Sequence, residues 1–454
     1  MLKSINPSNG ELIASYEEMT KGEVKVIISD VNSAYREWRQ TSFSHRAQLM
    51  NNAAQILQAK KEDLGKLMSI EMGKPFSQAV AEANKCASVC EYYADHAERI
   101  LGDQIIETDA SKSYITYRPI GIVFAVMPWN FPFWQVLRFA APALMAGNVG
   151  ILKHASNVQG CALEIEKVFQ DAGFPNNVFR TLIIGSKRVK EVIENPHIKA
   201  VTLTGSTPAG KAVASQAGAV LKKTVLELGG SDPYIILEDA DLDKAVTACM
   251  IGRFLNTGQS CIAAKRFIVV EPILGEFRTK LLEAMKTQKW GDPFDEDVNI
   301  GPMVNTWSRD EVHEQVTSSI EEGAKLLVGG KVPNVEGAYY PATLLDNVKP
   351  GMPAFDDEIF GPVASIVPVK NEAEAIRLAN QTPFGLGGAV FTRDVEKGER
   401  IAANDIKAGS CFVNDFVRSD PRLPFGGIKE SGYGRELSEA GIREFSNMKT
   451  VYIR

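Results

Sequence analysis

Cys261 and Glu227 are the side chains whose types and surroundings best suit covalent catalysis. Cys261 ends the run 256–261 (NTGQSC), and Glu227 lies in the run 226–230 (LELGG), where a strand-like stretch ends. A cysteine thiolate is a strong nucleophile near neutral pH, and a carboxylate can activate the water that removes an acyl group from sulfur. The two runs therefore predict a nucleophile and a base.

Asn130 is a third candidate. It lies in the run 127–132 (MPWNFP), where a strand-like stretch ends in a turn flanked by prolines and aromatic residues. Its amide could donate a hydrogen bond to an oxyanion. Taken alone, an Asn at such a turn more often stabilises the turn or caps the next helix, so its role depends on which residues lie beside it.

Length and composition limit the classes of function. A chain of 454 residues is too long for one core of ordinary size, so two or three lobes are expected. The net charge of −6 gives no electrostatic basis for binding nucleic acid or an anionic membrane, which leaves small molecules as the expected partners. Six scattered cysteines predict no disulfide framework, and five unclustered histidines predict no metal site. We expect a cytoplasmic enzyme, because the first residues lack the apolar stretch of a signal peptide.

The order of helical and strand-like segments predicts the fold class. Residues 47–100 have apolar positions at helical spacing. Strand-like runs separated by helical stretches then follow in two series, 121–127, 148–153, 179–184, 200–204 and 224–228, and 266–270, 326–328, 364–369 and 388–392. This alternation is typical of parallel sheets, so we expect two α/β domains with a boundary near 229–233.

Two further stretches, 113–118 and 449–454, alternate like strands but lie outside both series. As an edge pair they would attract a strand from a partner chain. The alternative is a small hairpin that lies on its own domain.

The run 205–212 (GSTPAGKA) comes within one residue of a phosphate-binding P-loop. Ala212 stands where a P-loop needs Ser or Thr to hold magnesium, which argues against an ATPase or a kinase. What remains is a glycine-flanked turn from strand to helix. Its amide groups would suit a phosphate, including a dinucleotide pyrophosphate.

The ordered series Asn130, Lys153, 205–210, Glu227, Cys261, 358–362 (EIFGP) and 424–427 (PFGG) resembles the aldehyde dehydrogenase superfamily over nearly the whole chain. The resemblance implies two parallel-sheet α/β domains with a small β oligomerisation arm. The dinucleotide-binding domain would comprise 1–100 and 120–229, the catalytic domain 230–440, and the arm 101–119 and 441–454. It also implies a homodimer or a homotetramer.

The resemblance assigns roles to the three candidates. Cys261 would attack an aldehyde to give a thiohemiacetal, whose oxygen Asn130 and the Cys261 amide would stabilise. Loss of hydride to the nicotinamide would leave a thioester, and Glu227 would activate the water that hydrolyses it. Phosphorylating or CoA-acylating relatives need no such base, so Glu227 favours hydrolysis. A catalytically silent dinucleotide-binding protein is the alternative from another class.

The resemblance also implies a cofactor site, formed by Trp129, Lys153, Ser156, Gly205, Ser206, Leu228, Glu358 and Phe360. Relatives that prefer NAD often carry Glu where this chain has Ser156, and that carboxylate would repel a 2′-phosphate. Ser156 removes the repulsion. We therefore expect NADP to be preferred, with NAD as the weaker alternative.

The expected substrate residues are Phe131, Trp134, Arg138, Ser419 and Phe425. Phe131, Trp134 and Arg138 share one helical face, and succinic semialdehyde dehydrogenases of this family carry Arg at the position of Arg138. A short aldehyde with a distal carboxylate is therefore the leading substrate. The match is incomplete, because Leu255 stands where some of those enzymes have a second Arg, and Arg418 or Ser419 would have to help. The alternative is a broad-specificity enzyme for uncharged aldehydes, with Arg138 turned away from the channel.

Overall fold

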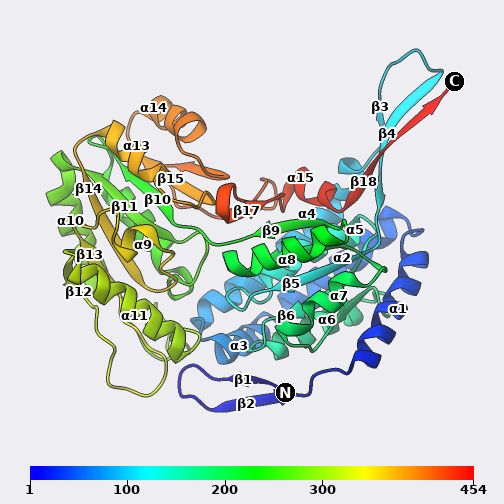
Figure 1. The fold of residues 1–454 in the computed structure, drawn as a ribbon, viewed down its shortest axis with the longest axis horizontal. Coiled ribbons are helices and arrows are strands. Elements are labelled where there is room, and N and C mark those ends of the chain that lie inside the picture. The colour runs from blue at the N-terminus through cyan, green and yellow to red at the C-terminus, as the bar shows by residue number, and fades with distance from the viewer.

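A computed structural model describes all 454 residues. Two large sheets occupy separate halves of the molecule (Figure 1). The first sheet has the strand order β17 (Gly432–Tyr433), β9 (Lys223–Glu227), β8 (Ile198–Thr204), β5 (Ile122–Met127), β6 (Val149–His154), β7 (Phe179–Thr181). The second has the order β12 (Lys325–Val328), β13 (Thr343–Asp346), β14 (Val363–Val369), β11 (Ala264–Val270), β10 (Asp232–Ile236), β15 (Gly387–Phe391), β16 (Ser410–Val413).

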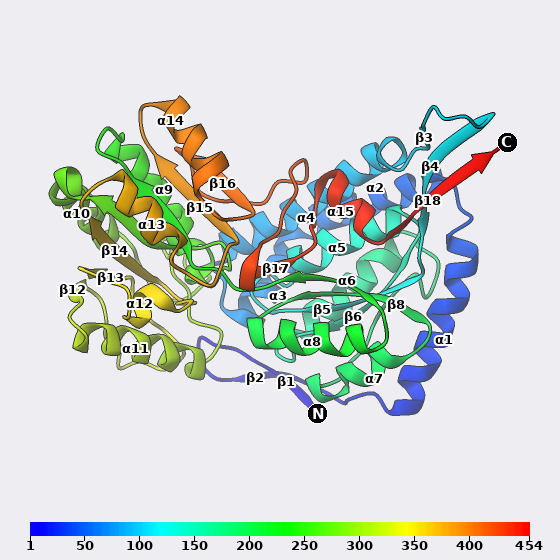
Figure 2. The same cartoon turned by 45° about the horizontal axis from the view of Figure 1, so that its top comes forward.

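Helices surround both sheets (Figure 2). The N-terminal half contains α1 (Lys21–Trp38), α2 (Phe43–Ala59), α3 (Lys61–Met72), α4 (Phe76–Ile100), α5 (Trp134–Met145), α6 (Gln159–Asp171), α7 (Val189–Glu194) and α8 (Thr207–Ala219). The rest of the chain contains α9 (Leu242–Phe254), α10 (Glu271–Lys286), α11 (Thr306–Glu321), α12 (Pro353–Asp356), α13 (Glu372–Asn380), α14 (Val395–Arg400) and α15 (Ser438–Glu444). No helix combines the length and the apolar character needed to cross a membrane.

The predicted fold class is confirmed. Strands pair in parallel throughout both sheets, except for β17 with β9 and β12 with β13. Every predicted strand-like run overlaps a strand, and the chain changes sheet between β9 and β10, inside the expected interval 229–233. These runs could be predicted because buried parallel strands are continuous apolar stretches.

Several strands were not predicted from the sequence. Residues 432–433, within the range 230–440 expected for the catalytic domain, form β17 and pair with β9 of the first sheet. A strand of two residues is too short to leave a periodic pattern in the sequence. An unpredicted hairpin, β1 (Leu2–Ile5) with β2 (Leu12–Tyr16), begins the chain.

The two isolated strand-like stretches pair with each other. β4 (Lys112–Pro119) and β18 (Ser446–Ile453) form an antiparallel ladder from the pair Ser446 and Pro119 to the pair Ile453 and Lys112, and β3 (Gln104–Ile105) adds to the other edge of β4. Figure 1 shows this sheet projecting away from the rest of the molecule beside the C-terminus. It is therefore not a hairpin packed on its own domain.

The order of strands in the first sheet fixes where a ligand can bind. From β5 the chain continues to β6 and β7 on one side, and returns to β8 and β9 on the other. The loops after β5 and β8 therefore diverge at the carboxyl edge, which is the usual ligand site of an open parallel sheet. Asn130 follows β5, Gly205 follows β8, and Glu227 ends β9, so the topology brings the predicted residues to one edge.

Candidate active site

The loop before Cys261 has an unusual backbone. Asn256 and Thr257 have φ values of 56° and 58°, and Gly258 follows with φ of 72°. Non-glycine residues rarely adopt this left-handed conformation, so surrounding contacts must hold it. Arg253, fully buried at the end of α9, donates hydrogen bonds to the carbonyl oxygens of Gly258 (2.6 Å) and Gly361 (2.8 Å).

Lys265 holds the loop from its other side. Its Nζ donates to the carbonyl oxygens of Ser260 and Cys261, each at 3.0 Å, and lies 3.5 Å from Oε1 of Glu358. By occupying these carbonyls, Lys265 fixes the peptide planes around Cys261 and therefore the direction of its backbone N–H. The sequence analysis did not identify Lys265, because a Lys at the start of a strand carries no distinctive signal.

Gly229 and Gly230, which follow β9, allow the end of that strand to approach the Cys261 loop closely. A Cβ at Gly230 would lie 2.7 Å from the Cys261 carbonyl oxygen, and one at Gly229 would collide with the Glu358 carboxylate. Only glycine has no Cβ, so the run LELGG needs both glycines to bring the end of β9 beside the nucleophile.

Cys261 lies where two cavities meet. One is a groove at the carboxyl edge of the first sheet, and the other is a cavity between α4, α5 and the loops after α9 and β16. Burial raises the pKa of the Cys261 thiol to about 12, although Arg138 and Lys265 act to lower that pKa. The resting side chain is therefore a thiol at neutral pH.

Asn130 lies beside the nucleophile loop. Its side-chain Nδ2 donates to the backbone carbonyl of Gln259 (3.1 Å), and its backbone carbonyl accepts from Nδ2 of Asn256 (2.7 Å). One N–H of the amide is committed to Gln259, and the second is available to a ligand. Both Asn130 and Cys261 line the groove, which brings together the two groups predicted to form an oxyanion hole.

His154 fixes the turn that carries Asn130. The ring of this fully buried residue contacts the carbonyls of Met127 (Nδ1, 3.2 Å) and Pro132 (Nε2, 2.9 Å). The Ala155 N–H donates to Nδ1 at 2.9 Å, so Nδ1 acts as an acceptor and the proton belongs on Nε2. Burial lowers the His154 pKa to about 4, which keeps the ring neutral.

Glu227 is buried at the end of β9, and neither of its carboxylate oxygens has a hydrogen-bond partner. Burial raises its pKa well above the ordinary value, and the nearby Glu436 carboxylate raises it further. Glu227 lines neither cavity; its Oε1 points toward Gly426, where a Cβ would come within 2.7 Å. No hydrogen bond restrains this side chain from turning toward Cys261.

The groove contains most of the residues predicted to bind a cofactor. Trp129, Gly205, Ser206, Leu228, Glu358 and Phe360 all line it, together with residues of α11 that the sequence analysis missed, such as Trp307 and Gln315. Lys153 and Ser156 lie outside this lining, at and just after the end of β6. Glu358 is engaged within the protein, because its Oε1 accepts from the Gly230 N–H at 2.9 Å.

The groove fits a dinucleotide. The 13-residue helix α8 begins beside Gly205 with no capping side-chain bond and no acid in its first turn, so its free N–H groups can receive a pyrophosphate. Lys153 is buried and forms no ion pair, so no protein carboxylate competes with a phosphate for its ammonium group. Burial lowers its pKa, and an anionic ligand would oppose that effect. Ser156 is exposed and places no negative charge near it.

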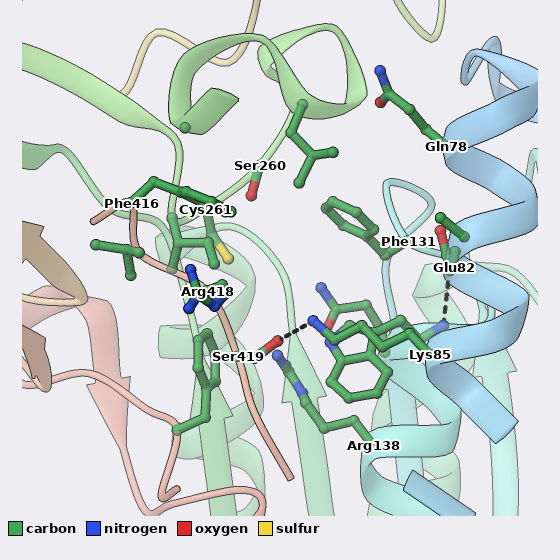
Figure 3. Close-up of a pocket in the computed structure, with 18 residues that line it drawn as sticks. Gln78, Glu82, Lys85, Phe131, Arg138, Ser260, Cys261, Phe416, Arg418 and Ser419 are labelled. Atoms are coloured by element: carbon green, nitrogen blue, oxygen red, sulfur yellow. Dashed lines mark hydrogen bonds between the residues drawn. The ribbon is translucent and has the colours of Figure 1, made fainter. Parts of the chain in front are cut away.

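All five predicted substrate residues, Phe131, Trp134, Arg138, Ser419 and Phe425, line the second cavity with Cys261. Figure 3 labels Phe131, Arg138 and Ser419 of this set around Cys261. Phe131 was predicted to share a helical face with Trp134 and Arg138, but α5 begins only at Trp134, so Phe131 belongs to the preceding turn. Glu82 of α4 fixes that start, because its Oε1 accepts from the backbone N–H of Phe133 (3.0 Å) and of Trp134 (2.9 Å), and its other oxygen pairs with buried Lys74.

Arg138 differs from the expectation in one respect. It is buried in the cavity wall as predicted, but its guanidinium already forms an ion pair with buried Glu436, contacts Thr204 Oγ1 at 3.4 Å, and lies over the Phe425 ring at 4.6 Å. Glu436 was not predicted from the sequence. It lies nearly three hundred positions after Arg138 and reaches it because the C-terminal segment packs beside α5. Arg138 therefore has a permanent carboxylate partner.

Comparisons with known proteins agree with this geometry. The model of the Aldehyde dehydrogenase family matches residues 1–451. A probable NADP(+) succinate-semialdehyde dehydrogenase of Synechocystis sp. is 49% identical over 452 residues, covering 100% of this chain and 99% of the relative. An NADP(+) succinate-semialdehyde dehydrogenase of Mycobacterium tuberculosis is 47% identical over 455 residues, covering 100% and 99%.

A solved structure gives the same result for the fold. The crystal structure of succinic semialdehyde dehydrogenase from Streptococcus pyogenes with NADP+ superposes with a TM-score of 0.97 at 36% identity, covering 100% of both chains. The nucleophile loop, the groove at the switch point and the match along the chain agree, and this protein belongs to the aldehyde dehydrogenase family.

Proposed function

We propose that this protein oxidises succinic semialdehyde to succinate with NADP, and with NAD less efficiently. The observation that carries the proposal is the position of Cys261, at the junction of a groove that fits a dinucleotide and a cavity lined by three cationic side chains, of which Arg138 is buried. A cation in a desolvated cavity favours a substrate with a carboxylate. The relatives and the solved structure named for succinic semialdehyde support this choice of substrate.

The residues of the chain would divide the chemistry as follows. Sγ of Cys261 loses its proton to water and bonds to the aldehyde carbon, and Nδ2 of Asn130 with the Cys261 N–H holds the oxygen that becomes negative. When bound, the dinucleotide supplies the two-electron oxidant that converts this adduct to a thioester. Glu227 then takes a proton from water, whose oxygen adds to the thioester carbon, and Sγ departs as the carboxylic acid forms.

The cofactor preference rests on the end of β6. Lys153 supplies a buried charge without a protein partner, and exposed Ser156 supplies a hydroxyl where a carboxylate would repel a 2′-phosphate. The two relatives named as NADP(+) enzymes support the same preference.

We propose the domain roles that the sequence indicates, with 1–100 and 120–229 binding the dinucleotide, 230–440 supplying the nucleophile, and 101–119 with 441–454 forming the arm. The pairing of β17 with β9 returns part of the C-terminal segment to the first domain. The projecting sheet supports a homodimer or a homotetramer, because it exposes Ile105, Met448 and Tyr452. A cytoplasmic location agrees with six cysteines of which none is paired.

Product analysis tests the proposed function. Purified protein incubated with succinic semialdehyde, NADP and water labelled with oxygen-18 should form one succinate for each reduced cofactor, with at least one labelled oxygen in the new carboxylate. Reduction of the cofactor without succinate, or turnover only when phosphate or coenzyme A is added, would contradict hydrolysis through Glu227. Absence of any turnover would favour a silent dinucleotide-binding protein.

A further inference from the structure

One wall of the substrate cavity holds a cation that the sequence analysis did not single out. Lys85 extends from the middle of α4, donates from Nζ to Oγ of Ser419 at 2.7 Å, and lies 4.3 Å from the centroid of the Trp134 ring. Both partners line the cavity with Cys261. Figure 3 shows the Lys85 and Ser419 side chains meeting beside Arg138.

Three cations line this cavity, and two already have a carboxylate. Arg138 pairs with Glu436, and Arg418, whose side chain is 49% exposed, pairs with Asp415 at 2.6 Å. Lys85 forms a hydrogen bond to a neutral hydroxyl and no ion pair. It is therefore the cation in this wall whose charge no protein carboxylate neutralises.

The nearest acid on the same helix cannot serve as that partner. Glu82 uses Oε1 to accept the backbone N–H groups of Phe133 and Trp134, and its other oxygen pairs with Lys74. Turning Glu82 toward Lys85 would leave buried Lys74 and the first N–H groups of α5 without partners, which is costly.

The surroundings of Lys85 disfavour an unpaired charge. Burial, together with Arg138 of α5, lowers its pKa to about 8, although Glu82 and Cys86 of α4 and Asp420 of the loop after β16 act in the opposite direction. An anionic ligand placed against Nζ would offset the cost of burial and the repulsion from Arg138.

We propose that Lys85, together with the Ser419 hydroxyl, binds the distal carboxylate of the aldehyde substrate, and that Arg138 serves as a positioning residue held by Glu436. This inference rests on the proposed function and assigns its specificity to residues of α4 and of the loop after β16. Nζ carries three N–H groups and uses one for Ser419, whose hydroxyl hydrogen remains free to donate. A carboxylate against this pair would receive hydrogen bonds from both.

The test compares kcat/KM for succinic semialdehyde with kcat/KM for butanal, which has the same chain length without the carboxylate. Lys85→Met keeps the length of the side chain and removes its charge. The ratio of the two efficiencies should fall about 10- to 100-fold, mainly through a higher KM for succinic semialdehyde. The control Lys66→Met removes an exposed lysine of α3 and should leave the ratio as in the wild type.

The outcomes separate the inference from the function on which it rests. A wild-type enzyme with equal efficiency toward both aldehydes would overturn the proposed substrate. A wild-type preference that Lys85→Met retains would overturn the assignment to Lys85 alone, as would an equal loss toward both aldehydes, which would indicate a structural role.

A second variant and the pH dependence of the same ratio complete the test. Lys85→Arg keeps a cation beside Ser419 and should recover most of the lost ratio. In the wild type the ratio should fall as the pH rises through about 8, where free Lys85 loses its proton, whereas Lys85→Arg should show no such fall. Asp420 titrates near pH 2, far from this range. A ratio independent of pH in the wild type would contradict the proposal.

Discussion

The Cys261 thiol is protected from deprotonation in the resting protein. Burial raises its pKa to about 12, and the charges of Arg138 and Lys265 only partly oppose this effect. Lys265 uses its N–H groups on the Ser260 and Cys261 carbonyls, and Arg138 is committed to Glu436. The site therefore fixes the direction of the nucleophile without a preformed thiolate.

Alkylation with iodoacetamide should follow this pKa. The rate at Cys261 should rise about tenfold for each pH unit between 7 and 9, because the thiolate fraction grows in that proportion below the pKa. Mass spectrometry of the labelled peptide measures the rate, and Cys261→Ser supplies the background from half-buried Cys411. A plateau in the rate below pH 9 would show a thiolate already formed.

Glu227 should be needed for hydrolysis and not for the first chemical step. Glu227→Gln keeps the size of the side chain and removes the base, so we expect one equivalent of reduced cofactor in a burst, followed by turnover about 100- to 10,000-fold slower than in the wild type. Wild-type kcat should rise with pH as the carboxyl with the raised pKa loses its proton. Loss of the burst itself would place Glu227 before the thioester.

At the scale of elements, the end of β6 is the segment that we propose to set the cofactor preference. Ser156→Glu introduces a carboxylate at an exposed position three residues after Lys153. The ratio of kcat/KM for NADP to that for NAD should fall at least about tenfold, because the new charge repels a 2′-phosphate. The uncharged control Ser156→Gln should change the ratio less. An unchanged ratio in Ser156→Glu would remove this segment from the phosphate site.

The contacts by which the His154 ring, at the end of β6, holds the turn after β5 should weaken in acid. The folded-state pKa of His154, about 4, lies below the unfolded value of about 6.5, so its stabilising contribution is complete above pH 6.5 and is lost as the pH falls toward 4. Urea unfolding should show a smaller loss of stability between pH 7 and 5 in His154→Gln than in the wild type.

The wild type has to be compared with His154→Gln because Asp232 changes the stability with pH in the opposite direction. Its folded-state pKa is raised to about 7, so its proton favours the folded state as the pH falls below that value. Asp232 is common to both proteins and cancels in the difference. Equal pH dependence in the wild type and His154→Gln would contradict the role given to His154.

The sequence predicts the elements and residues that carry local signals. The apolar strand runs, the turn after β8, and the motifs around Asn130, Glu227 and Cys261 were identified because their signals lie within a few adjacent residues. Lys85, Lys265 and Glu436 were missed because each acts through packing between distant segments. Ser419, for example, lies 334 positions after Lys85. No spacing in the sequence indicated the partner of Arg138, although helical spacing did indicate the face that carries Arg138.

At the scale of the whole molecule, catalysis depends on both halves. The first sheet supplies Asn130, Glu227 and the groove, and the segment between β10 and β11 of the second sheet supplies Cys261. Buried contacts such as the hydrogen bond from Asn130 to Gln259 cross between them. A change in the relative position of the halves would therefore separate the nucleophile from its oxyanion donor.

The projecting sheet should control assembly. Met448 and Tyr452 of β18 are 66% and 49% exposed, and an apolar face of this kind is expected to be buried by a partner chain. Met448→Lys with Tyr452→Lys should convert the proposed dimer or tetramer to a smaller species of unchanged helix content, as measured by light scattering and circular dichroism. Lys449→Gln on the same strand is the control. A wild-type monomer would contradict this role for the sheet.

The proposed function depends most directly on a preference for aldehydes with a distal carboxylate. We would measure kcat/KM of the wild-type protein with NADP for succinic semialdehyde and for butanal. One charge-assisted contact predicts a preference of about 10- to 100-fold for succinic semialdehyde. Equal efficiencies would leave the roles of Cys261 and Glu227 in place, but would contradict a carboxylate site in the cavity and favour a broad-specificity enzyme for uncharged aldehydes.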